Sequence, residues 1–284
     1  MSAVEIRPID VRHLGRPRVI CAWLAGDVLI DPGPASSIEA LLDGLAGFVP
    51  RVIALTHIHL DHAGATGTLA ARWPAVEIAV HERGARHMID PSRLIDSATR
   101  LYGADMDRLW GEIRPVPEDR VTVLRGGERL GDLEVAYTPG HASHHVSYWD
   151  AQTGTAFTGD VAGVRIEPLE YVLAPTPPPD IDIEAWHGSI ALLRAWQPER
   201  LAVTHFGAAA DPQAHLDRLD AALDRWAARA RETEREQFAN ELRADIEAQC
   251  SPEDANCYRQ GAPYEHIYDG LARYWAKRAA PASA

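Results

Sequence analysis

Thr56-His57-Ile58-His59-Leu60-Asp61-His62-Ala63-Gly64 is the stretch that decides the fold, because it gathers three imidazoles and one carboxylate within six residues. Imidazole suits zinc, iron, nickel and copper, and a carboxylate extends that range toward harder metals. Four donors on one short loop crowd a single ion. Two adjacent ions can use them, with His57 and His59 facing one and Asp61 and His62 facing the other. A solvated loop of unrelated histidines is the alternative interpretation.

Further donors follow downstream, each at the end of a short apolar run and beside glycine or proline. His141 follows Thr138-Pro139-Gly140, Asp160 follows Thr158-Gly159, and His205 follows Thr204. Rigid strands aim such side chains at a shared cleft, and small residues let the backbone turn tightly there. In this order, the downstream donors favour a metal site over a solvated loop.

With these motifs the chain resembles the metallo-β-lactamase superfamily, in its dinuclear, glyoxalase II-like hydrolase branch. The resemblance covers roughly residues 4 to 210 and rests on five elements in sequence order: Asp31-Pro-Gly33, the H-x-H-x-D-H motif, Pro139-Gly-His141, Thr158-Gly-Asp160 and Thr204-His205. It implies three ligands for a first metal ion: His57, His59 and His141. It implies three ligands for a second: Asp61, His62 and His205.

The resemblance also assigns roles to two carboxylates outside these triplets. Asp160 resembles the carboxylate that bridges both ions, and Asp31 matches a position that supports a ligand imidazole from behind. Two divalent ions are implied, with zinc as the expected metal and iron or manganese as alternatives. Asp61 would act in catalysis as well, by orienting the attacking hydroxide or collecting its proton.

The alternation of predicted strands and helices suits a four-layer αβ/βα sandwich, the metallo-β-lactamase fold, in which helices cover two packed sheets. We expect a catalytic domain over residues 1–210 with a helical insertion at about 82–118. In that insertion arginines alternate with apolar residues. Met106, Leu109 and Trp110 are its candidates for a pocket wall.

Residues 211–284 form a predicted C-terminal helical extension. One long charged helix is expected over 211–249, then a break over 251–263 and a second helix over 264–277. Such helices cannot bury both faces alone. We expect them either to pack beside the mouth of the active site or to form a homodimer interface.

Composition narrows the function classes. The 284 residues carry a net charge of −13, which argues against non-specific nucleic-acid binding and against a polybasic membrane anchor. No apolar run approaches the ~20 residues that span a bilayer, and the N-terminus lacks the features of a signal peptide. The three cysteines form no disulfide framework, although Cys250 and Cys257 could pair. We therefore expect a cytoplasmic protein with a small-molecule substrate.

Several other residues have two interpretations each. His145 either supports the site from behind or simply begins a strand, while His144 is expected in solvent. Tyr171 either donates to substrate or packs against other aromatic residues. The remaining histidines are expected at the surface or as satisfied core residues: His13, His81, His87, His187, His215 and His266.

The resemblance implies a dinuclear metal-dependent hydrolase that cleaves a small thioester, ester or lactone. The alternative is a mononuclear iron persulfide dioxygenase of the same superfamily, which would leave His62 and His205 without a metal. A third hypothesis is a redox or binding module that merely keeps the metal site. Such a binder is expected to have lost ligands, and all seven donors are present.

Overall fold

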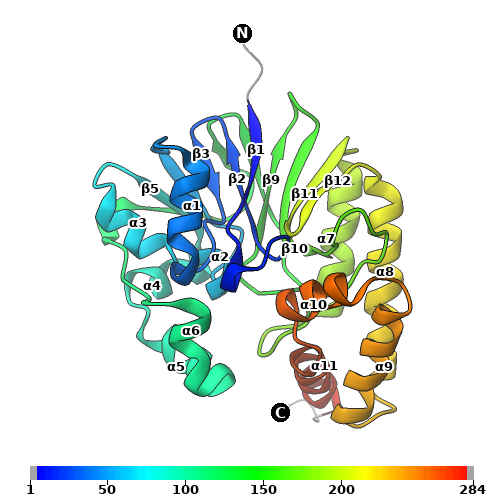
Figure 1. The fold of residues 1–284 in the computed structure, drawn as a ribbon. Coiled ribbons are helices and arrows are strands. Elements are labelled where there is room, and N and C mark those ends of the chain that lie inside the picture. The colour runs from blue at the N-terminus through cyan, green and yellow to red at the C-terminus, as the bar shows by residue number, and fades with distance from the viewer. Residues whose placement is uncertain (1–4, 280–284) are drawn as a thin grey trace, which may run out of the picture.

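The computed structural model describes residues 5–279 and has the expected four-layer αβ/βα architecture. Two six-stranded sheets face each other, and helices cover their outer faces (Figure 1). The prediction of a sandwich is thus confirmed. None of the helices in the described part of the chain is both long and apolar enough to cross a membrane.

The first sheet is built from the N-terminal half of the chain. Its strands follow the order β1 (Ile6–Asp10), β2 (Cys21–Ala25), β3 (Val28–Ile30), β4 (Val52–Ala54), β5 (Glu77–His81) and β6 (Val121–Leu124). Pairing is antiparallel from β1 to β3 and parallel from β3 to β6. Parallel neighbours need crossover segments, and these supply the helices on the outer face of the sheet.

The second sheet follows the order β12 (Gly207–Ala209), β11 (Arg200–His205), β10 (Thr155–Val164), β9 (Val146–Asp150), β8 (Leu133–Tyr137) and β7 (Arg129–Leu130). Only β10 and β11 pair in parallel. All ten residues of β10 are buried, and the strand continues beyond Phe157 as far as Val164. The additional residues place Asp160 inside a strand at the centre of the fold.

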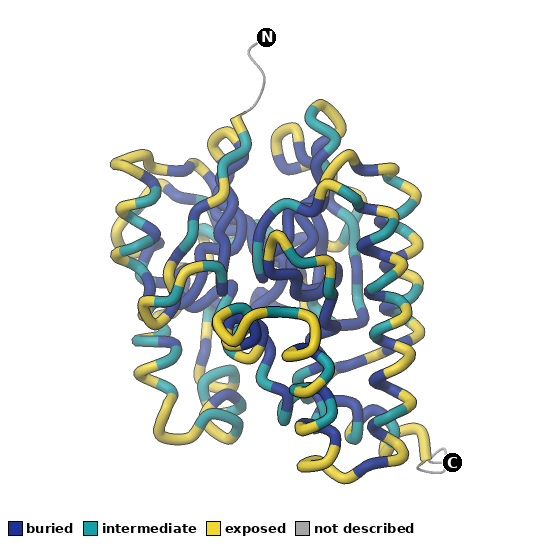
Figure 2. The backbone as a smooth tube through the Cα atoms, turned by 45° about the vertical axis from the view of Figure 1, so that its right-hand side comes forward, coloured by how far each residue is buried: buried dark blue, intermediate teal, exposed yellow. Residues whose placement is uncertain are grey.

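Tight packing between the two sheets fixes their relative position. Aromatic side chains from both sheets fill the interface, including Trp23, Tyr148 and Phe157. The Trp23 Nε1–H donates to the Val203 carbonyl at 3.1 Å, and the Tyr148 hydroxyl donates to the Leu55 carbonyl at 2.7 Å. Each bond joins one sheet to the other. The central strands are buried, while the outer helices alternate buried and exposed residues (Figure 2).

Six helices accompany the first sheet: α1 (Ile38–Leu45), α2 (Leu60–Ala63), α3 (Thr66–Arg72), α4 (Glu82–Ile89), α5 (Ser92–Tyr102) and α6 (Met106–Trp110). The last three form the predicted helical insertion. Neither Ser36 nor Ser37 caps α1 with its side chain. Ser37 makes no capping bond with its side chain, and the Ser36 hydroxyl donates instead to the Leu109 carbonyl at 2.6 Å.

Five helices follow in the second half: α7 (Ile183–Ala195), α8 (Pro212–Arg229), α9 (Arg235–Glu247), α10 (Pro252–Gly261) and α11 (Tyr264–Ala279). The prediction of one helix over 211–249 was wrong. The chain turns between α8 and α9, where the Thr233 hydroxyl donates to the Arg229 carbonyl at 2.9 Å. Trp226 and Phe238 then pack edge to face across the turn, at 5.3 Å.

The expected break over 251–263 was also wrong, because residues 252–261 form α10. Ser251 caps this helix, since its hydroxyl accepts the Asp254 N–H at 3.2 Å. Pro252 follows at the first helical position, where a missing N–H costs nothing. Cys250 and Cys257 are both free thiols. The C-terminal helices pack back on the sandwich, opposite α4–α6 (Figure 1).

Candidate metal centre

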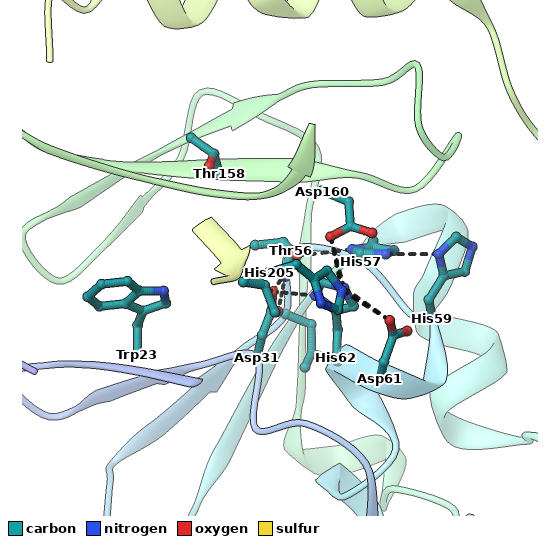
Figure 3. A network of polar contacts seen from close by, with 12 residues as sticks. Trp23, Asp31, Thr56, His57, His59, Asp61, His62, Thr158, Asp160 and His205 are labelled. Atoms are coloured by element: carbon teal, nitrogen blue, oxygen red, sulfur yellow. Dashed lines mark hydrogen bonds and ion pairs between the residues drawn. The ribbon is translucent and has the colours of Figure 1, made fainter. Parts of the chain in front are cut away.

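Seven predicted donors meet at one edge of the sandwich, brought there by both sheets. The loop after β4 presents His57 and His59, and the short helix α2 carries Asp61 and His62. The second sheet supplies the other three donors: His141 from the loop between β8 and β9, Asp160 from β10, and His205 from the end of β11. Figure 3 labels six of these side chains, which turn toward a common space: His57, His59, Asp61, His62, Asp160 and His205.

The first group consists of His57, His59, His141 and Asp160, whose donor atoms all lie within 4.8 Å of one another. His59 Nδ1 lies 3.0 Å from both His57 Nε2 and His141 Nε2. One ring N–H cannot serve two partners at once. Three nitrogens that converge in this way have the arrangement of ligands around one cation.

The second group consists of Asp61, His62 and His205, whose donor atoms also lie within 4.8 Å of one another. His205 Nε2 is 3.2 Å from Asp61 Oδ2, and His62 Nε2 is 3.8 Å from the same oxygen. This group is therefore a compact set of one carboxylate and two imidazoles beside the first group.

Asp160 lies between the two groups and offers one oxygen to each. Its Oδ2 is 3.4 Å from His141 Nε2 in the first group. Its Oδ1 is 3.2 Å from His62 Nε2 and 3.6 Å from His205 Nε2 in the second. A carboxylate in this position can bridge two ions.

Hydrogen bonds behind the imidazoles determine which ring nitrogen is free. His141 Nδ1 donates to the Pro175 carbonyl at 2.8 Å, and His205 Nδ1 donates to the Val19 carbonyl at 2.7 Å. His62 Nδ1 donates to the Asp31 carboxylate at 2.8 Å. In each ring the Nε2 lone pair must then face the centre, as it does in histidines that bind metals. The sequence carried no signal for the two carbonyl partners.

Asp31 is the anchor behind this edge, and it is completely buried. Besides His62, its carboxylate accepts the Thr56 N–H at 2.8 Å, the Thr56 hydroxyl at 2.6 Å and the Thr204 hydroxyl at 3.2 Å. It thus joins the ends of β3, β4 and β11. The expected supporting position of Asp31 agrees with these contacts. Since Thr56 donates to Asp31, its hydroxyl oxygen can accept from His57 Nδ1, at 3.1 Å.

The pKa values of the histidines divide along the same two groups. Burial lowers the pKa of His57 well below its usual range, and burial together with neighbouring His141 lowers that of His59 to about 3. These rings are neutral at physiological pH, the state that binds metal. Burial opposes protonation of His62 too, but Asp160 and the other nearby carboxylates outweigh it and raise its pKa. The second group therefore attracts positive charge.

Three buried polar atoms in the centre lack a hydrogen-bond partner in the described chain: His62 Nε2, Asp160 Oδ1 and His205 Nε2. Buried polar groups are normally paired, because an unpaired one costs about 1–3 kcal/mol. Converging lone pairs and a bridging carboxylate fit divalent cations, so these residues can hold two ions. A mixed imidazole and carboxylate set accepts zinc, iron or manganese.

The centre opens into a cavity of about 780 Å³. Its floor contains His59, Asp61 and Asp160. Its walls come from α4 and α5, from the proline-rich loop 175–180, and from residues 261–267 between α10 and α11. The C-terminal helices therefore lie beside the mouth of the site, one of the two arrangements expected. A homodimer interface stays a prediction.

Several secondary predictions about the pocket were wrong. Met106, Leu109 and Trp110 do not line it; they pack against Leu60 and Ala98 in a small separate core. Residues of α4 and α5, which precede Met106 in the chain, form the pocket wall instead. The sequence alone could not show which apolar helical face lines the pocket and which packs in the core.

The flanking histidines also differ from expectation. His144, expected in solvent, lines the pocket and stacks on His57 with 6.1 Å between ring centroids. His87 and His266 line the pocket as well. His145 immediately precedes β9 and lies behind the site, where its ring stacks on His57 with 5.0 Å between centroids.

Tyr171 follows the packing alternative. Its ring contacts Tyr258 edge to face, and its hydroxyl donates to Asp245 at 2.9 Å. It contributes nothing to the lining of the cavity.

Fold and site together define a metallo-β-lactamase-type sandwich with a two-group metal centre. Residues 24–205 match the Metallo-beta-lactamase superfamily. This match spans more than half of the chain, which belongs to that superfamily. Among curated proteins, a metallo-beta-lactamase fold-containing protein, ST1585 from Sulfurisphaera tokodaii, is 28% identical over 217 residues, or 73% of this chain and 78% of its own.

Solved structures agree on the fold. The crystal structure of ST1585 superimposes with a TM-score of 0.69 at 24% identity, covering 94% of this chain and 98% of that one. TTHA1623 in a di-iron-bound form gives a TM-score of 0.52 at 26% identity, covering 78% and 94%. A hydroxyacylglutathione hydrolase from Legionella pneumophila is 26% identical over 133 residues, which are 46% of this chain and only 41% of that protein.

Proposed function

We propose that this protein is a dinuclear metal-dependent hydrolase that cleaves an activated carbonyl compound: a thioester, an ester or a lactone. The observation that carries the proposal is the position of Asp160. One of its oxygens faces the first group of donors and the other faces the second. A mononuclear centre would use the first group alone and would leave His62 and His205 without a function.

The two ions, when bound, would lower the pKa of water to about 7 and polarise the substrate carbonyl. The chain contributes the rest. Asp61 lies on the floor of the cavity, where its carboxylate can orient the attacking water and accept its proton. Asp160 sets the separation of the two groups. Asp31, Pro175 and Val19 hold the imidazoles in one tautomer, so that the donor set is preformed.

Of the three candidate substrates, the thioester has support from distant relatives. Several curated hydroxyacylglutathione hydrolases match this chain at 26–32% identity over less than half of their length. The name of these relatives denotes hydrolysis of a hydroxyacyl group from glutathione. Lactones and simple esters present the same electrophilic carbonyl, so they belong in the same test. Zinc is the metal we expect, with iron and manganese as alternatives.

The test combines metal analysis with a substrate panel. About two ions per chain and hydrolysis of a thioester, ester or lactone are expected. Asp160→Ala and His59→Ala should abolish turnover while the far-UV spectrum stays unchanged. His187→Ala is the matched control, because that histidine bonds Asp220 and Asp224 of α8 and does not line the cavity.

Two outcomes would overturn the proposal. One is full activity after metal removal. The other is a single iron per chain together with oxygen uptake on addition of glutathione persulfide, which would establish the mononuclear dioxygenase.

A further inference from the structure

One wall of the cavity is strongly basic although the protein is acidic. The chain carries 28 basic against 41 acidic side chains. Four arginines nevertheless line this single cavity, two from α4 and two from α5: Arg83, Arg86, Arg93 and Arg100. Placing four positive charges side by side is unfavourable unless something compensates them.

The compensation does not come from the chain. Of the other 23 arginines, 13 form ion pairs with described residues. Within residues 5–279, none of the four on this wall has a carboxylate within 4.0 Å of its guanidinium. Glu82, which also lines the cavity, is held by Arg125 at 2.8 Å, and Asp180 accepts the Ser143 hydroxyl at 2.8 Å.

The arginines retain most of their hydrogen-bonding capacity. Arg86 donates to His87 at 3.2 Å, and Arg83 reaches the Ser143 carbonyl at 3.5 Å. Arg93 and Arg100 are exposed and make no hydrogen bond to any residue that the structure describes. A guanidinium presents five donors in a planar fork that matches carboxylate and phosphate. Four such groups in one cavity form a surface that is suited to bind anions.

The four arginines are spread along α4 and α5 rather than gathered around one point. Arg83 and Arg86 are one turn apart on α4. Arg93 and Arg100 are two turns apart on α5, or about 10 Å along the helix axis. A single small anion cannot contact all of them, so the spacing fits a ligand with more than one anionic group.

Apolar residues form another part of the cavity lining. The proline-rich loop contributes Pro175, Pro177 and Pro178, the turn after α10 contributes Ala262, and α11 contributes Ile267. These residues can accept an uncharged acyl group beside the metal centre. One cavity therefore offers both guanidinium groups and apolar surface. A molecule in which an acyl group is joined to a charged carrier combines the same two features.

We propose that the arginines of α4 and α5 bind the carrier portion of the substrate, and that this carrier bears two or more phosphate or carboxylate groups. The inference rests on the proposed hydrolase function and specifies its substrate class: an acyl thioester of a polyanionic thiol. Phosphate and carboxylate share this recognition chemistry, and the experiment distinguishes them.

The first arm measures binding without turnover. Free coenzyme A, which carries phosphates, and free glutathione, which carries carboxylates, are titrated calorimetrically into the metal-loaded protein. We expect at least one to bind, more weakly at higher salt. The double variant R93Q/R100Q should weaken that binding about tenfold or more. Arg72→Gln is the control, since Arg72 is exposed on α3 outside the cavity.

The second arm compares kcat/KM for one acyl group on three thiols: coenzyme A, glutathione and the uncharged N-acetylcysteamine. R93Q/R100Q should lose activity on a charged thioester and keep it on the neutral one. Equal loss on all three, or no loss on any, would overturn the inference. So would the absence of any binding of either thiol that depends on the arginines.

The two proposals can fail separately. Arginine-dependent binding of a thiol without hydrolysis of any thioester would leave the anion site standing and remove the thioesterase function. Hydrolysis of the neutral and the charged thioesters at the same rate, unaffected by R93Q/R100Q, would keep the hydrolase and remove the anion site.

Discussion

The Asp31 carboxylate accepts the Nδ1–H of His62 at 2.8 Å, and both side chains are completely buried. Asp31 leaves the first sheet at the end of β3, whereas His62 lies on α2 beyond the metal-binding loop. The bond therefore fixes the ring of a donor from a position that does not face the cavity. It also keeps the Nε2 atom of His62 on the side of the ring that faces Asp160 and Asp61.

Asp31→Asn should weaken metal binding by the second group about 10- to 100-fold, because an amide removes the negative charge that orients and polarises His62. The measurement is metal content per chain after dialysis against a graded series of chelator concentrations. Thr158→Val is the control, as it removes another buried hydroxyl, bonded to the Ala202 carbonyl at 3.4 Å, without touching the centre. Unchanged metal retention in Asp31→Asn would refute a supporting role for Asp31.

Gly140→Ala should destabilise the fold and displace His141, its neighbour. Gly140 has a φ of +138°, and a Cβ there would lie 2.4 Å from Trp186 Cα. Strain of this kind costs of order 1–3 kcal/mol before the clash is relieved. Gly127→Ala is a control with a φ of +96° and open space around the added carbon. Chemical denaturation should give a clearly larger loss for Gly140→Ala, together with reduced metal content only in that variant. Equal losses would mean that the contact with Trp186 is unimportant.

Much of the fold followed from local patterns, and the errors have physical causes. The metal motif and the alternating apolar runs predicted the sandwich because strand ends must converge for seven donors to meet. The charged residues of 211–249 have continuous helix propensity and so predict one helix. Tertiary packing of Trp226 on Phe238 overrides that propensity and turns the chain.

For the site, the sequence predicted the metal donors but not all of the groups that orient them. Its donors have side-chain signals, so all of them could be named. Two of the groups that orient them are backbone carbonyls, of Val19 and Pro175, which have no residue preference to detect. The arginines of α4 and α5 were visible as charges, but only the structure shows which arginines have carboxylate partners. The wrong pocket wall, Met106 to Trp110, arose because apolar helical faces look alike in sequence.

Acid should remove one specific contribution to stability at the start of α8. Burial raises the pKa of Asp211, but Arg165 and Arg218 outweigh it and lower the pKa to about 2, below the unfolded value of about 3.9. The ion pairs therefore stabilise the fold fully above about pH 5, and this contribution is lost as the pH falls toward 2. Since the carboxylate is 36% exposed, we expect about 1 kcal/mol.

The measurement is the difference in free energy of unfolding between the wild type and Asp211→Asn at pH 7, 4 and 3. The difference should be constant near neutrality and should shrink with acid. Asp43→Asn is the control, because Asp43 is exposed and forms no ion pair with any described residue. A difference that grows as the pH falls would contradict the assignment.

Tyr258→Phe should loosen the attachment of the C-terminal helices to the sandwich. The Tyr258 hydroxyl, on α10, donates to the Tyr171 carbonyl at 2.7 Å and accepts the Ile166 N–H at 3.2 Å. Removing one oxygen leaves two backbone groups without a partner in a buried setting. We expect a loss of about 1–3 kcal/mol in the free energy of unfolding.

Tyr268→Phe is the matched control for this bond. Its hydroxyl is half-buried and donates only to the Thr233 carbonyl at 3.2 Å, within the extension itself. Hydrogen exchange of residues 252–279 should accelerate in Tyr258→Phe and change little in Tyr268→Phe. If the two variants lose equal stability and exchange alike, the attachment of α10 depends on apolar packing rather than on this pair of bonds. Because residues 261–267 line the cavity, the looser variant should also bind thiol ligands less tightly.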